Sequence, residues 1–117
     1  MEFQVEFYES ENGRSPVRKF LDTLKKSDPD DFAIIMAGLA KLQNRDYHRA
    51  PLSKPIGDGL FELRHVGKLN TRVLYFFRSG QRIILVHGIR SKAREILKHD
   101  LEVARMRKSN WIARYSI

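Results

Sequence analysis

Two arginines on neighbouring predicted strands are the first candidates for chemistry. Arg64 alternates with the apolar residues Phe61 and Leu63, so it should point to the opposite face of its strand. Arg72 begins the next strand and could lie near Arg64 across the sheet. Two guanidiniums on one exposed face would form a phosphate clamp, because each presents a planar fork of N–H donors. The alternative is that both are ordinary solvated charges on a strand.

A second basic group lies between the last predicted strand and the last predicted helix. Arg90, Lys92 and Arg94 occupy alternate positions there. They either take part in chemistry or form a positive loop that binds an anionic partner without taking part in a reaction. His87 ends the preceding apolar strand, and its ordinary pKa suits proton transfer near neutral pH. The alternative for His87 is a half-buried structural histidine whose hydrogen bonds are satisfied.

Positive charge is concentrated in the second half of the chain. The net charge is +8. Residues 1–50 hold eight Lys/Arg and nine Asp/Glu, whereas residues 51–117 hold fourteen Lys/Arg and five Asp/Glu. A basic half of this kind predicts an anionic partner such as nucleic acid or an acidic protein. The alternative is that these charges only keep a small domain in solution.

The composition excludes several classes of protein. The 117 residues contain no cysteine, so disulfides and thiolate–metal sites are excluded, and neither a metal nor a cofactor is expected. No apolar run approaches the roughly 20 residues that a membrane span needs. The first residues lack the basic start and the apolar stretch of a signal peptide. The chain is therefore expected in the cytoplasm, without a membrane partner.

Hydrophobic periodicity and turn residues predict the elements of the first half. Residues 3–8 alternate between apolar and polar side chains, which is typical of a half-buried strand. Ser15-Pro16 and Asp28-Pro29 each resemble a helix cap followed by proline at the first helical position. They predict helices over about 16–26 and from Pro29 to near Asn44. Two helices joined this closely should form an antiparallel hairpin.

Three strands and one helix are predicted in the second half. Residues 48–59 contain two prolines and two glycines and are expected to be an irregular connection. Strands beginning near residues 61, 72 and 82 should form an antiparallel meander, because the turns between them are short. Ser91 is expected to cap a last helix through about Lys108, and Trp111 indicates that the following tail docks on something. The predicted order is β-α-α-β-β-β-α, an α+β sandwich in a single domain over residues 1–117.

Three segments of the chain carry a resemblance to a known family: residues 52–64 (LSKPIGDGLFELR), 72–77 (RVLYFF) and 84–89 (ILVHGI). They resemble the RelE/ParE/HigB toxin superfamily, most closely its phage-derived, HigB-like branch. They occur in the expected order on the expected strands, and the resemblance covers roughly residues 1–108. It implies a RelE-like fold, in which a helical pair packs on one face of a curved antiparallel sheet and a further helix follows.

The resemblance also implies a function. Members of the superfamily are toxins of type II toxin–antitoxin pairs, and the RelE and HigB branches enter the ribosomal A site and cut mRNA by attack of a 2′-OH on the adjacent phosphate. The ParE branch instead inhibits DNA gyrase without nuclease activity, and an inactive remnant that only binds an antitoxin is a third alternative. The expected partners are the ribosome, mRNA and a cognate antitoxin, which should be a helix-turn-helix protein that forms an oligomer with the toxin.

By resemblance, basic residues of the strands and of the last junction should form the active surface. One position departs from RelE, which carries a lysine where this chain has Glu62. A carboxylate there could act as a base, but it would also repel phosphate. The residues expected to be catalytic are Arg64, Arg72, Arg90, Lys92 and His87, and those expected to bind RNA are Lys54, Lys68, Arg94 and Lys98.

Overall fold

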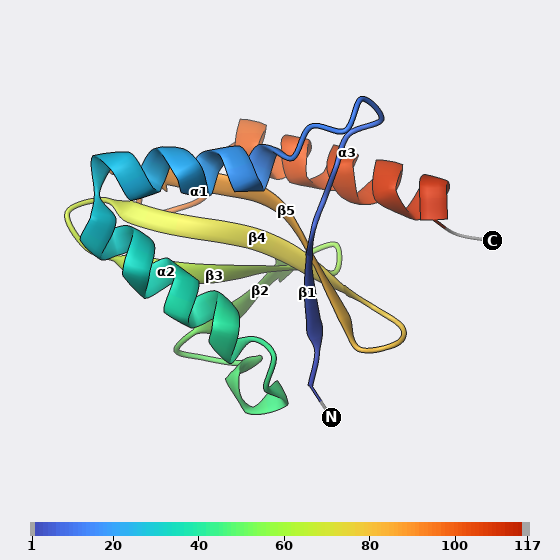
Figure 1. The fold of residues 1–117 in the computed structure, drawn as a ribbon, viewed down its shortest axis with the longest axis horizontal. Helices are drawn as coiled ribbons and strands as arrows, with labels where there is room; N and C mark the ends of the chain where they lie inside the picture. The colour runs from blue at the N-terminus through green and yellow to red at the C-terminus, as the bar shows by residue number, and fades with distance from the viewer. Residues whose placement is uncertain (1, 116–117) are drawn as a thin grey trace.

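A computed structural model describes residues 2–115 of the chain (Figure 1). It is an α+β fold, as predicted, but it contains one more strand than expected, and the order is β-α-α-β-β-β-β-α. A short 3-10 helix, η1, follows the second α-helix. The elements are β1 (Gln4–Phe7), α1 (Pro16–Ser27), α2 (Pro29–Lys41), η1 (Arg45–Tyr47), β2 (Ser53–Gly57), β3 (Leu60–Val66), β4 (Asn70–Arg78), β5 (Arg82–Ser91) and α3 (Lys98–Tyr115).

The helical hairpin α1–α2 begins where its caps predict. The Ser15 side chain accepts a hydrogen bond from the backbone N–H of Arg18, and the Asp28 side chain accepts one from the N–H of Asp31. Each bond satisfies a donor that the first turn of a helix leaves free. Asp28 also ends α1, since its own N–H donates to the Leu24 carbonyl. A single residue therefore turns the chain between the two helices.

The sheet has the strand order β1-β5-β4-β3-β2. The strands β2 to β5 pair antiparallel with their neighbours, which confirms the predicted meander and extends it by β2. β1 pairs with β5 in parallel, from Gln4 opposite Arg82 to Phe7 opposite Leu85. The sheet is therefore antiparallel, as the resemblance implies, except at the edge formed by β1. The prediction of an irregular connection over residues 48–59 was wrong for the part that forms β2, although the pairing of β2 with β3 does shift register between Pro55 and Gly57.

Two separate apolar layers cover the two faces of the sheet. The helices α1 and α2 pack on one face and α3 packs on the other, so α3 lies across the sheet from the hairpin (Figure 1). The core under the hairpin includes Leu63, Val73 and Tyr75, while the core under α3 includes Leu74 and Phe76. Successive residues of β4 therefore alternate between the two layers, as the geometry of a strand requires.

A bulge in β5 changes which residues face α3. The register with β4 shifts between the pairs Tyr75–Leu85 and Leu74–His87, so Val86 is the extra residue. After the bulge the alternation is inverted, and Gly88 lies on the hairpin face. There the absence of a side chain lets the Phe20 ring approach, because an added Cβ would lie only 2.3 Å from it.

The last helix differs from the prediction at both ends. Ser91 ends β5 and does not cap a helix, since α3 begins only at Lys98. The helix continues through the predicted tail to Tyr115, because Trp111 is buried and packs edge-on against Phe76, with ring centroids 5.6 Å apart. The expectation that Trp111 docks is thus confirmed. Within residues 2–115, no helix is long and apolar enough to cross a membrane.

Candidate functional site

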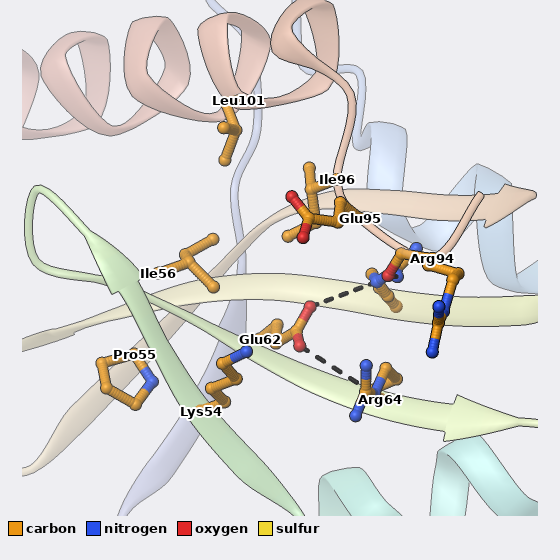
Figure 2. A pocket seen from close by; sticks show the side chains of 10 residues that line it. Lys54, Pro55, Ile56, Glu62, Arg64, Arg94, Glu95, Ile96 and Leu101 are labelled. Atoms are coloured by element: carbon orange, nitrogen blue, oxygen red, sulfur yellow. Dashed lines mark hydrogen bonds and ion pairs between the residues drawn. The ribbon is translucent and has the colours of Figure 1, made fainter.

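A cleft of about 650 Å³ opens on the α3 face of the sheet (Figure 2). Its floor is formed by β2, β3 and β4, and its opposite wall by the segment between β5 and α3 together with the start of α3. Charged side chains occupy one part of the lining and aliphatic side chains another. The lining residues are Lys54, Pro55, Ile56, Glu62, Arg64, Arg72, Arg94, Glu95, Ile96 and Leu101.

Strand pairing brings the charged residues of the floor together. In the β2–β3 ladder Lys54 lies opposite Glu62, and in the β3–β4 ladder Arg64 lies opposite Arg72. Residues two apart on a strand share a face, so Glu62 and Arg64 point the same way. The predicted meeting of Arg64 and Arg72 across the sheet is confirmed.

Glu62 is the centre of this group. Its side chain is 5% exposed, and its Oε2 lies 3.2 Å from Nε of Arg72. Its Oε1 lies 4.0 Å from Nε of Arg64 (Figure 2). The two arginines differ in exposure: the Arg64 side chain is 42% exposed and that of Arg72 only 1%. The expectation that both guanidiniums are exposed was therefore wrong for Arg72.

Arg72 is buried because it also holds the opposite wall of the cleft. Its Nη2 donates to the carbonyl oxygen of Arg94, and to that of Ala93 at 3.3 Å. The Asn70 side-chain amide donates to the same Ala93 carbonyl at 2.8 Å. The Arg72 guanidinium therefore donates hydrogen bonds to two backbone carbonyls while its Nε forms an ion pair with Glu62. These bonds fasten the segment that carries Arg94 beside Glu62.

Arg90 lies on the opposite face of the sheet from the cleft. Its Nη2 is 2.5 Å from Oδ2 of Asp28, and its Nε is 3.5 Å from Oδ2 of Asp31. Thr71, its partner on β4, donates a hydrogen bond to Asp31. Arg90 therefore ties β5 to the start of α2. The inversion at the β5 bulge explains why the structure does not bring this residue to Arg64 and Arg72.

His87 lies under α3 and outside the cleft lining. Its Nε2 is 2.8 Å from Oδ1 of Asp100, and its Nδ1 is 3.0 Å from Nη1 of Arg107, which also donates to the Val86 carbonyl at 2.8 Å. Because the guanidinium can only donate, Nδ1 must be an acceptor, so the ring is neutral with its proton on Nε2. Burial lowers the pKa of His87, and its hydrogen bond to Asp100 offsets this only in part. These are the contacts of a half-buried structural histidine whose hydrogen bonds are satisfied.

Protonation of His87 should weaken the fold below neutral pH. Its pKa in the folded protein lies below the ordinary value of 6.5, so the unfolded chain takes up the proton first as the pH falls. The contribution of His87 to the free energy of unfolding should be constant above about pH 6.5 and should decrease below it. Urea titrations between about pH 7.5 and 5.5 should therefore show a smaller loss of stability in His87→Gln than in the wild type.

The matched control for this prediction is the exposed His99, one residue before Asp100. The His99→Gln variant should retain most of the pH dependence of the wild type, because the charge of His99 is the smallest of the causes that shift the pKa of His87. Equal pH dependence in wild type and His87→Gln would mean that His87 has the same pKa in the folded and the unfolded chain.

The remaining basic candidates divide between the cleft and the open surface. Lys54 and Arg94 line the cleft, as residues that bind an anion in it should. Among the described residues, the cleft lining does not include Lys68 in the β3–β4 turn, Lys92 after β5, or Lys98 at the start of α3. All three side chains are exposed.

Sequence reasoning did not choose Glu62 or Glu95 as site residues. The available signal for Glu62 was its position two residues before Arg64 on the same strand, which requires both side chains to share a face. No comparable signal existed for Glu95 or for the aliphatic wall. Their positions depend on the segment that Arg72 holds, and this contact links residues far apart in the sequence.

Comparison with known proteins gives a family for this arrangement. The family model described as "Phage derived protein Gp49-like (DUF891)" matches residues 19–109, which include all the strands of the meander and the whole cleft lining. No curated protein sequence matches the chain. The match covers well over half of the chain, so the protein belongs to the Gp49-like family of phage-derived proteins, which is a family of RelE/HigB-type toxins.

Proposed function

We propose that this toxin is an endoribonuclease that cuts mRNA on the ribosome and thereby stops translation. Membership of the Gp49-like family supports the toxin role and an antitoxin partner. The observation that carries the nuclease proposal is the cleft, where the Glu62 carboxylate lies between two arginines and opposite Lys54. This set combines a proton acceptor, a proton donor and positive charge in one place.

The reaction requires a general base, positive charge that stabilises the transition state, and a general acid. The 2′-OH of one nucleotide loses its proton to the Glu62 carboxylate and attacks the adjacent phosphorus. Arg64 stabilises the extra negative charge on the phosphorane-like transition state, because its exposed guanidinium can form two parallel hydrogen bonds with phosphate oxygens. The bond from phosphorus to the 5′-oxygen then breaks, and the Lys54 ammonium protonates that oxygen. The products are a 2′,3′-cyclic phosphate and a 5′-OH end.

In this proposal the remaining basic residues orient the site or bind the RNA. Arg72 orients Glu62 and the cleft wall, while Arg94 at the rim contacts the RNA backbone. Lys68, Lys92 and Lys98 add to a positive surface that attracts RNA phosphates from outside the cleft. Arg90 and His87 act through the fold, since their polar atoms already bond Asp28, Asp31, Asp100 and Arg107.

Mapping of mRNA ends in a reconstituted translation reaction tests the proposal. The purified toxin should produce new 5′-OH ends that are phased with codons, only when ribosomes are present. The upstream fragments should carry 2′,3′-cyclic phosphates. Intact mRNA, together with blocked DNA supercoiling in a parallel gyrase assay, would replace this proposal with the ParE-type function.

The antitoxin should neutralise the same basic surface. The net charge of +8 should attract an acidic segment of a helix-turn-helix antitoxin. The toxin–antitoxin complex should form a larger oligomer. Since ribosomes and mRNA are the proposed targets, the toxin acts in the cytoplasm.

A further inference from the structure

The proposed cleavage uses only the charged part of the cleft. The other part has an aliphatic lining formed by Ile56 on β2, Ile96 before α3 and Leu101 in the first turns of α3. Figure 2 shows these three side chains gathered on one side of Glu62, away from Arg64. Phosphate and ribose are too polar to benefit from an aliphatic wall, whereas the face of a nucleobase packs well against one.

Glu95 stands at the edge of this aliphatic part. Its side chain is exposed, and its carboxylate lies on the cleft side of the segment before α3 (Figure 2). Glu62 is paired with two arginines, but Glu95 makes no hydrogen bond or ion pair with any residue in the described part of the chain. An unpaired carboxylate repels phosphate, so its position in a basic cleft suits the edge of a base.

We propose that Glu95 and the aliphatic wall form a subsite for a guanine base beside the scissile phosphate. This inference rests on the proposed nuclease function and adds a sequence preference to it. A carboxylate offers two acceptor oxygens, and guanine is the standard base whose Watson–Crick edge presents two adjacent donors, N1–H and N2–H. In adenine and cytosine the amino group adjoins a ring nitrogen that is itself an acceptor. In uracil a single N–H lies between two carbonyls.

Cleavage of synthetic mRNAs on programmed ribosomes tests this subsite. A set of mRNAs would place each standard base, or inosine, at each position of the A-site codon. The wild type should cut fastest with guanine at one fixed position relative to the cut. Inosine there lacks only the N2 amino group, and it should slow cleavage by about tenfold to a hundredfold, because one hydrogen bond to a charged group is lost.

The Glu95→Gln variant should lose this preference and retain cleavage. Its rates on guanine and inosine mRNAs should be nearly equal, because the amide presents one acceptor and one donor in place of two acceptors. The matched control is Glu102→Gln, which removes the same charge from an exposed position of α3 outside the cleft, and it should keep the preference of the wild type.

The outcomes separate this inference from the proposed function. Wild-type cleavage without a guanine preference, or an unchanged preference in Glu95→Gln, would overturn the subsite and leave the nuclease intact. Absence of cleavage on every mRNA would overturn the nuclease and the subsite together.

Discussion

Replacing Arg72 by alanine should lower the free energy of unfolding by about 3–5 kcal/mol, the usual loss when one partner of a buried ion pair is removed. The Arg72 side chain is 1% exposed, and its removal leaves Glu62 buried beside an empty space. The carbonyl oxygens of Ala93 and Arg94 lose their donor in the same change. Urea denaturation followed by circular dichroism measures the loss.

A double variant distinguishes the buried charge from the loss of packing. Arg72→Met combined with Glu62→Leu removes both charges and keeps apolar volume in the site. It should recover more than about half of the stability that Arg72→Ala loses, because no unpaired carboxylate is left. A stability of Arg72→Ala within about 1 kcal/mol of the wild type would show that Arg72 does not hold Glu62 and the cleft wall in solution.

Replacing Arg64 by alanine should lower the rate of mRNA cleavage by about 10²–10³-fold, the typical effect of removing one group that stabilises charge in a transition state. Stability should change by less than about 1 kcal/mol, because the Arg64 side chain is 42% exposed and its Nε lies 4.0 Å from the Glu62 carboxylate. The measurement is the single-turnover rate on programmed ribosomes, with unfolding monitored in parallel.

Two further variants sharpen the prediction for Arg64. Arg64→Lys keeps the charge but loses the planar fork, so it should restore only part of the rate. Arg14→Ala removes an exposed arginine from the turn before α1, outside the cleft lining, and should cleave like the wild type. If Arg64→Ala cleaves within a fewfold of the wild type, the developing charge is stabilised elsewhere.

Local patterns were sufficient to predict most of the fold. The caps at Ser15 and Asp28 placed both helices of the hairpin, and the alternation in β3, β4 and β5 placed the meander. β2 was missed because Pro55 and Gly57 are typical of a loop. An edge strand tolerates them, since one side of it has no partner strand to bond.

The site was less predictable, because its geometry depends on contacts between distant segments. The pairing of Arg64 with Arg72 follows from a short turn and could be expected. The burial of Arg72 depends on the segment before α3, which remains non-helical where its carbonyls accept bonds from that guanidinium. Arg90 was expected at the active surface by resemblance, but the extra residue at Val86, for which the sequence contains no local signal, puts it on the opposite face of the sheet.

Both the sheet and the cleft join segments that lie far apart along the chain. β1 is made before β5, so it cannot join the sheet until Arg82 to Leu85 have been made, and long-range pairing of this kind forms slowly. The wall that carries Glu95, Ile96 and Leu101 is synthesised later still. A nascent chain therefore has no finished cleft until its residues up to Leu101 have been synthesised.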